Sequence, residues 1–341
     1  MSSSGKRALI VVAVLCLIGA GIAYYYIHGF GKNPVLAPGA PPDLFSFVPS
    51  DAPLIVYGDV AAVKASPAFA NGSVLFSPGV AQDPIYRDFV NQTGFDYSRD
   101  LDRFVLAIWP NAETASTVLA ERVRLIAVAD GRFDHEKIDA YARKVGKASN
   151  GTGRVIYETP SAIPGKGISF TFLAANRIAF AQGMSLDPVL HPALESTHDA
   201  AMRERIGRVS GAEFFAVAHT DDLPKAIGAH ELQSGQLNRV AKSIHDITLS
   251  GQPAGDNFIL AVDADCDSLS NALQLSTLLD TMRWLGRAAL ADPRTRAQMY
   301  PSDAALLDSL LRVAAVSHEN RSVRLRLELT PQILQGAAKT Q

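Results

Sequence analysis

The sequence has 341 residues, of which 48% are hydrophobic and 19% are charged. That share of apolar residues fills a sizeable core, which excludes a disordered chain. The formal net charge of −2, without any basic block, argues against nucleic acid as a partner, because phosphate binding needs clustered Lys and Arg.

An uncharged apolar run occupies residues 8–27, directly after Lys6 and Arg7. At about 1.5 Å per residue the run spans the roughly 30 Å hydrocarbon core of a bilayer. The preceding cations place residues 1–7 in the cytoplasm. Three tyrosines, 24–26, lie at the far end, where their rings favour the membrane interface. We therefore predict a single-pass anchor in the inner (cytoplasmic) membrane, with the rest of the chain in the periplasm or outside the cell.

Two other interpretations of the N-terminal run remain open. A cleaved signal peptide is the first, because Gly21 and Ala23 offer small residues before a cut at Tyr24. A lipoprotein is the second, although Leu15 before Cys16 is bulky for that signal. The length of the run and the tyrosines favour the uncleaved anchor. All three interpretations place most of the chain outside the cytoplasm.

Residues 28–42 are predicted to form an extended spacer, because the stretch NPVLAPGAPP contains four prolines, which lock φ and remove donors. The globular part begins near Asp43. It is more acidic than the whole chain, since three cations, at 6, 7 and 32, precede it. Anionic headgroups do not attract such a surface, so the anchor rather than charge would hold the chain at the membrane.

The first half of the globular part, residues 43–195, alternates strands with helices. Asp83 and Asp134 are predicted helix N-caps, and Gly94 and Gly146 are the matching stops. The pattern of apolar residues predicts a strand entering a turn at 53–63, strands at 102–109 and 123–129, and a hairpin at 168–181.

The second half, residues 208–335, has a similar order. It is predicted to contain a strand at 213–223, a helix at 234–245, strands at 246–251 and 257–264, helices at 267–290 and 303–313, and a hairpin at 313–329. In the long helix, one apolar face is predicted from residues 269, 272, 275, 279, 282 and 285. In the hairpin, Val323, Leu325, Leu327 and Leu329 alternate with Arg324, Arg326 and Glu328, which indicates a sheet with one wet face.

Both halves therefore fit the order β-α-β-β-α-β-β, and both end in a hairpin whose turn contains Asn-Arg, at Asn176-Arg177 and Asn320-Arg321. The predicted fold class is α+β, with two similar mixed sheet-and-helix modules after a transmembrane helix. The alternative is a single α+β domain without duplication.

Three alternating aspartates, Asp263, Asp265 and Asp267, are the candidates for a metal site. A calcium loop needs Gly at its sixth position and Glu at its twelfth, and those positions hold Ser268 and Gln274. A strand-to-helix junction also favours a carboxylate, which accepts free N–H groups and complements the helix dipole. We therefore expect a helix cap here, and neither a metal nor a cofactor.

The search for catalytic motifs assigns no activity to the sequence. Three His-Glu pairs, at His135, His230 and His318, lack the second His of a zinc protease, and we expect all three to be exposed. Neither a G-x-S-x-G elbow nor a nucleotide-binding glycine loop is present. Isolated candidates remain: the pair His191 and His198 for a metal, Cys266 as a thiol nucleophile, and Arg324 with Arg326 for an anion. Each also suits a plain structural role.

The first half resembles a family of uncharacterised bacterial exported, membrane-anchored proteins in three stretches: LFSFVPSDAPLIVYGDVAAVKASPAF, GFDYSRDLDRFVLAI and ADGRFDHEKIDAYA. Members share an apolar N-terminal segment and a start of the form P-x-DAP-x-x-x-Y-x-D. The likeness covers roughly residues 44–177. It implies an exported location and an α+β fold, and it implies no activity, substrate or catalytic residue.

These features favour a non-enzymatic envelope protein that binds another protein, a cell-wall component or a lipid. One alternative is a hydrolase with an unrecognised site of Asp, Glu or His, since carboxylates far apart in sequence can meet in a fold. The other is a carrier that holds an apolar ligand between a sheet and its helices.

Overall fold

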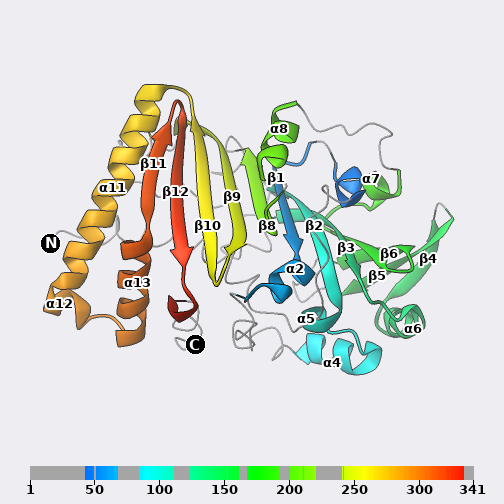
Figure 1. Cartoon of the computed structure of the whole chain (residues 1–341). Helices are drawn as coiled ribbons and strands as arrows, with labels where there is room; N and C mark the ends of the chain where they lie inside the picture. The colour runs from blue at the N-terminus through cyan, green and yellow to red at the C-terminus, as the bar shows by residue number, and fades with distance from the viewer. Residues whose placement is uncertain are drawn as a thin grey trace. The chain divides into compact units, whose positions relative to one another are not determined.

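The computed structural model of the chain describes residues 43–49, 51–67, 84–110, 123–151, 153–160, 167–191, 200–209, 211–219, 240 and 242–333 (Figure 1). The predicted anchor and spacer lie outside these residues. Within them, none of the helices has the length and apolar character needed to cross a bilayer. Two compact units are present: an eight-stranded unit (residues 32–63 and 78–233) and a four-stranded unit (residues 1–31, 64–77 and 234–341).

The fold is α+β, and neighbouring strands within each unit pair antiparallel (Figure 1). The elements from residue 43 to residue 219 are η1 (Asp43–Phe47), β1 (Leu54–Asp59), α2 (Val60–Ala65), α4 (Pro84–Thr93), α5 (Tyr97–Asp100), β2 (Leu101–Pro110), β3 (Val123–Gly131), α6 (His135–Val145), β4 (Lys147–Gly151), β5 (Arg154–Pro160), β6 (Gly167–Ala174), β7 (Arg177–Gln182), α7 (Asp187–Leu190), α8 (Ala200–Val209) and β8 (Phe214–His219). The strand order is β8-β1-β2-β3-β7-β6-β5-β4.

Local sequence signals set several of these boundaries as predicted. Asp134 caps α6, since its Oδ1 accepts the Lys137 N–H at 3.1 Å, and Gly146 follows the last residue of the helix. Gly94 ends α4 with a φ of 73°, a left-handed conformation that glycine adopts without steric cost. The strands predicted at 102–109 and 123–129 and the hairpin at 168–181 are confirmed as β2, β3, β6 and β7. The stretch at 53–63 is confirmed only in part, because β1 ends at Asp59 and the chain then forms the helix α2.

One face of the eight-stranded sheet carries the main core of the unit. Strand residues of this core include Tyr57, Val105, Val128 and Phe215, all almost fully buried. The covering side chains come from η1 and the helical segments around it: Leu44, Val48, Leu186, Val189, Met202 and Ile206. Leu44, the second residue of η1, is fully buried in this core.

The four-stranded unit contains β9 (Ile244–Ala254), β10 (Asn257–Cys266), α11 (Leu269–Ala291), α12 (Pro293–Arg296), α13 (Pro301–Val313), β11 (Ala315–Glu319) and β12 (Ser322–Leu329). Its strand order is β11-β12-β10-β9, and α11 and α13 pack against the sheet (Figure 1). The helix predicted at 234–245 is corrected at its end: β9 already begins at Ile244, and residues 234–239 and 241 lie outside the described part.

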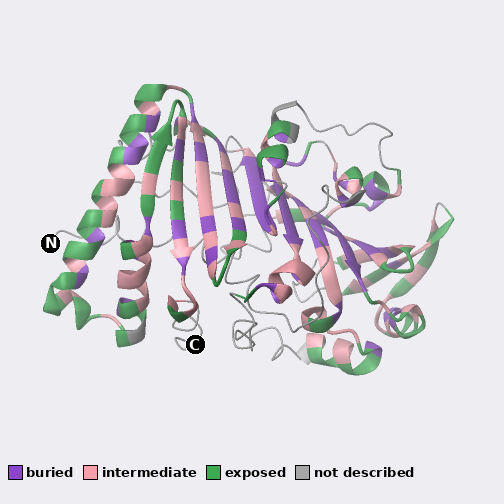
Figure 2. Cartoon of the chain, viewed as in Figure 1, coloured by how far each residue is buried: buried purple, intermediate pink, exposed green. Residues whose placement is uncertain are grey.

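The predicted alternation in β12 is confirmed, because Val323, Leu327 and Leu329 are buried and Arg324 and Arg326 are exposed. The apolar face predicted for α11 is only partly right (Figure 2). Its inner face buries Ala272, Leu275 and Leu290, whereas Leu269 and Leu285 are about half exposed. The N-cap also differs from the expectation: Ser268, not Asp267, accepts the Asn271 N–H at 3.2 Å, because β10 continues to Cys266.

Candidate functional site

A row of charged side chains crosses five neighbouring strands at one end of the eight-stranded sheet. Register places Asp59 of β1 opposite Arg103, Arg103 opposite Asp130, and Asp130 opposite Arg177 of β7. Glu213, just before β8, joins the row through its carbonyl, which accepts the Asp59 N–H at 2.6 Å.

The charged row lies on the core side of the sheet. Side chains two residues apart on a strand share a face. The residues two positions inward from the row are Tyr57, Val105, Val128, Ala179 and Phe215, and all five belong to the main core. The row therefore closes the core at this end of the sheet.

Asp130 is the centre of the row and is almost fully buried. Arg177 donates to it twice, from Nε to Oδ1 at 2.7 Å and from Nη2 to Oδ2 at 3.0 Å. Arg103 adds a third bond, from Nη2 to Oδ2 at 3.1 Å. The guanidinium of Arg177 also lies 5.5 Å from the ring centre of Phe47 in η1. These bonds occupy the carboxylate, so Asp130 serves as a structural acceptor that ties β2, β3 and β7 together, and Arg177 extends the contact to η1.

Glu213 and Asp59 form the acidic end of the row. Burial, with the charge of Asp59 adding to it, raises the pKa of Glu213 to about 7. Burial also raises the pKa of Asp59, against a hydrogen bond from the Ala62 N–H and the attraction of Arg103. The Glu213 Oε2 atom is buried and has no hydrogen-bond partner among the described residues. Glu213 therefore gains and loses its proton near neutral pH. A carboxylate whose oxygens are fully paired with cations does not.

Replacing Glu213 by Gln is expected to remove a pH-dependent loss of stability. A pKa that is raised from 4.5 to about 7 means that the folded state holds the proton more tightly than the unfolded state. Stability therefore falls as pH rises from about 4.5 to about 7, and stays lower above that range. A pKa shift of one unit corresponds to about 1.36 kcal/mol of stability. After a discount for the partial exposure of Glu213, the loss of stability over this pH range is about 2 kcal/mol.

Urea unfolding of both proteins at pH 5 and pH 8 measures this effect. The Glu213→Gln protein should gain about 2 kcal/mol relative to the original chain between these two pH values. Groups that do not interact with Glu213 titrate equally in both proteins and cancel in the difference. Parallel curves for the two proteins would contradict the assignment to Glu213.

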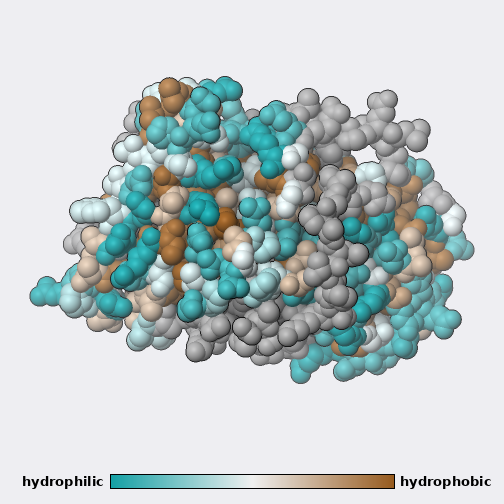
Figure 3. Space-filling model, in the orientation of Figure 1, coloured by the Kyte–Doolittle hydropathy of each residue, from teal (hydrophilic) through white to brown (hydrophobic). Residues whose placement is uncertain are grey.

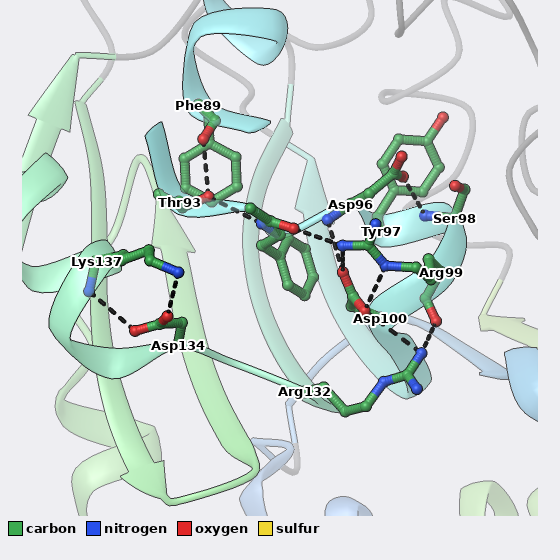
Figure 4. A network of polar contacts seen from close by, with 12 residues as sticks. Phe89, Thr93, Asp96, Tyr97, Ser98, Arg99, Asp100, Arg132, Asp134 and Lys137 are labelled. Carbon is green, nitrogen blue, oxygen red and sulfur yellow. Dashed lines mark hydrogen bonds and ion pairs between the residues drawn. The ribbon is translucent and has the colours of Figure 1, made fainter. Parts of the chain in front are cut away.

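A second polar network surrounds Asp100, at the junction of α5 and β2 (Figure 4). Arg99 donates from Nη2 at 2.6 Å and from Nε at 3.0 Å, and the Asp96 N–H donates at 2.9 Å. Arg132, which follows β3, lies 3.4 Å from the same carboxylate and also donates to the Arg99 carbonyl. Burial alone raises the pKa of Asp100, but the bonds from Arg99 and Asp96 outweigh it and hold the pKa below its usual value. The network fixes the α4–α5 segment to the end of the sheet.

The three candidate metal ligands do not share one site. Asp263, within β10, accepts two bonds from Arg324 of β12, at 2.6 Å and 3.1 Å. Asp265 lies opposite Asp246 of β9 in the sheet register, and Asp267, after the strand, pairs with His245. Across the described part of the chain, His, Cys, Asp and Glu side chains form no group of three or more that suits a metal ion.

The isolated candidates from the sequence are also dispersed. Cys266 is buried in the four-stranded unit, and burial, with the charges of Asp265 and Asp267, raises its pKa to about 11, which disfavours the thiolate. His191 is exposed, and His198 lies outside the described residues, as does His230.

Two further candidates have partners within their own units. Arg324 forms an ion pair with Asp263, and Arg326 lies 3.5 Å from Glu328. Both arginines therefore already have a carboxylate partner, which disfavours the binding of an anion. The expectation that His135 is simply exposed is wrong: its ring stacks on Phe172 with 3.8 Å between centroids, and Nε2 contacts the Ala175 carbonyl. His318 is exposed, as expected.

The outward face of α11 carries exposed apolar side chains. Trp284 has 67% of its surface exposed, and Leu273 is exposed on the same side of the helix. Thr277 and Thr281 lie between them and donate their hydroxyls to the Leu273 and Thr277 carbonyls, at 2.8 and 2.7 Å. Apolar atoms stand at the surface over the first turns of α11 (Figure 3).

Charge is almost absent from this outward face. Asp280 and Arg283 lie toward its margin and pair with each other at 3.0 Å, and Arg283 also donates to the Ala314 carbonyl at 2.6 Å. The exposed Arg287 lies on the same margin, one turn from Trp284. Because the two threonine hydroxyls bond to the backbone, little hydrogen bonding is lost if a partner covers them. A long, exposed and nearly uncharged helix face is typical of a contact surface.

Sequence comparison adds no relative: no known family model matches the chain, and no curated protein matches it in sequence. Among solved structures, crystal forms I, III and IV of TP0453 are similar, with TM-scores of 0.43, 0.44 and 0.44 and sequence identities of 8%, 8% and 10%. The alignments cover 89%, 89% and 88% of this chain and 98%, 99% and 97% of those chains. Likeness at this level carries no inference about function.

Proposed function

We propose that the chain is a membrane-anchored protein of the cell envelope whose ectodomain binds a partner and catalyses no reaction. The observation that carries the binding role is the exposed, nearly uncharged outward face of α11 with Trp284 at its surface. The two buried carboxylates at the centres of the polar networks, Asp130 and Asp100, already accept several bonds from arginines, which suits a structural role.

The anchor part of the proposal rests on the apolar run at 8–27, the cations at 6 and 7, and the tyrosines that follow. The spacer at 28–42 then leads into η1, whose Leu44 is fully buried in the eight-stranded unit. In this arrangement the ectodomain stays close to the outer surface of the inner membrane.

Fractionation of cells that express the full chain tests the anchor. We expect the protein to stay in the membrane fraction after washing with high salt, because the apolar run and not surface charge holds it. Detergent should release it intact. A mature chain that begins at Tyr24, as seen by N-terminal sequencing, would refute the anchor and favour a cleaved signal peptide.

We also propose that the two halves of the ectodomain arose by duplication. In each unit an antiparallel pair of strands, β2–β3 or β9–β10, is followed by a later hairpin, β6–β7 or β11–β12. The chain between them forms α6, β4 and β5 in the first unit and α11, α12 and α13 in the second. The last strand of that hairpin pairs with the second strand of the first pair, which gives the orders β2-β3-β7-β6 and β9-β10-β12-β11.

The turns of the two hairpins support the same correspondence. The hairpin turns contain Asn176 in one unit and Asn320 in the other.

A further inference from the structure

The Glu213 carboxylate lies at a strand end, where it has a second carboxylate as its neighbour and no donor. Gly58 of β1 is paired with Phe214 of β8, and the Asp59 N–H donates to the Glu213 carbonyl at 2.6 Å, so Asp59 and Glu213 are cross-strand neighbours. Like charges at such positions repel each other. Because Oε2 of Glu213 is buried and has no hydrogen-bond partner among the described residues, this place suits a neutral side chain better than an ion.

The surrounding charges direct the proton to Glu213 rather than to Asp59. Burial raises the pKa of Asp59, but the Ala62 N–H on its Oδ1 and Arg103 opposite it on β2 both favour its ionised form, against the charge of Asp102. Glu213 has no such support, since α8 packs against β8 but its described cations do not offset the charge of Asp59 at Glu213. Burial, together with that charge, raises the pKa of Glu213 to about 7.

Glu213 is also the last residue of the short connector from α8 to β8. α8 ends at Val209, and β8 begins at Phe214. An ionised carboxylate has to reach water, and strand ends and connectors open at lower cost than the core. Outward movement of the connector would separate Glu213 from Asp59 and break the bond between the Asp59 N–H and the Glu213 carbonyl.

The core further along the same strands limits this movement. Tyr57 and Phe215, two residues inward from Asp59 and Glu213, are almost fully buried, and their ring centres lie 5.2 Å apart. The Tyr57 hydroxyl stays neutral, because burial, with the charge of Asp59, raises its pKa further above the physiological range. A movement that Glu213 causes should therefore stay at the end of the sheet.

We propose that Glu213 is a pH-sensitive switch, which keeps the α8–β8 connector on β1 when it is protonated and releases the connector when it is ionised. In the released form Glu213 regains its ordinary pKa of 4.5, against about 7 in the closed form. The closed form is therefore favoured at low pH and the released form at high pH, with the transition between about pH 4.5 and pH 7. The switch does not depend on the binding role proposed for α11.

Amide hydrogen exchange of the full chain in detergent micelles, resolved to single residues, tests the switch at pH 5 and pH 8. Each rate is compared with that of an unstructured peptide at the same pH, which removes the direct effect of pH on exchange. At pH 5 the Asp59 amide should be protected by its bond to the Glu213 carbonyl. At pH 8 it should exchange within about tenfold of the unstructured rate, while the Val128 amide in β3 should remain protected about a hundredfold more strongly or better.

Two variants identify the group responsible. Glu213→Gln keeps the shape of the side chain and cannot ionise, so it should protect the Asp59 amide equally at both pH values. Glu204→Gln removes an exposed carboxylate from α8 in the same unit and should leave the switch intact.

Three results would overturn the inference. The first is a Glu213→Gln protein that loses the same protection at pH 8. The second is an original chain whose Asp59 amide is as well protected at pH 8 as at pH 5. The third is equal protection of the Asp59 and Val128 amides at pH 8, because the whole unit would then open together and no local switch would exist.

Discussion

Replacing Asp130 by Asn is expected to destabilise the eight-stranded unit by about 3 to 5 kcal/mol, because it leaves two arginines without their shared acceptor. Arg177 is itself largely buried and donates to Asp130 twice, and Arg103 donates once. The amide can accept from only one of the two guanidiniums at full strength, and it carries no charge to balance them. Urea unfolding followed by the fluorescence of the buried Trp109, in a Trp284→Phe background, measures the loss.

The matched control is Glu204→Gln. Glu204 forms an exposed pair with Arg208, four residues along α8 in the same unit. Exposed pairs of this kind contribute about 0.3 to 0.5 kcal/mol, so the control should change the free energy of unfolding little. If Asp130→Asn cost no more than Glu204→Gln, the charged row would not hold the end of the sheet together.

Local sequence signals were sufficient to predict the elements whose boundaries and buried faces depend on nearby residues. Asp134 and Gly146 bound α6 as predicted, and the alternation of Val323 to Leu329 predicted which side of β12 is buried. Each of these features depends on residues within one or two turns of helix or along one strand. The α+β class followed from the sum of such elements.

The charged row could not be predicted, because it depends on strand register between segments far apart in the sequence. Asp59 and Arg103 become neighbours only through the pairing of β1 with β2, and Arg177 joins Asp130 only because β7 inserts beside β3. A weak signal was nevertheless present. Each charged residue stands at the end of an apolar run, two positions from a residue of the core. Charged residues at the ends of several predicted strands therefore indicate that such a row exists. Only the fold shows which residues belong to it.

The error on α11 has a similar origin. Apolar periodicity alone assigned Leu269 and Leu285 to the buried face, but the sheet and α13 determine which side is covered. Gly286 lies on that side: a Cβ there would lie 2.9 Å from Leu311 Cδ1 of α13, so the two helices approach closely at this point. A small residue at a close contact is difficult to tell from a neutral helix position by sequence alone.

Replacing Leu327 by Asp is expected to unfold the four-stranded unit. Leu327 is buried on β12 opposite Leu260 of β10, on the same side of the strand as Val323, which packs in the cluster containing Ala272 of α11. A carboxylate at this position would lose its water without gaining a partner, at a cost of several kcal/mol, which is a large part of the stability of a small unit. Amide hydrogen exchange resolves the effect by region, and peptides from β9 to β12 should lose protection.

Arg326→Asp, one residue away on the exposed side, should change stability by only about 0.5 kcal/mol. Retained protection in β9 to β12 of the Leu327→Asp protein would mean that α11 and α13 do not close over this face of the sheet.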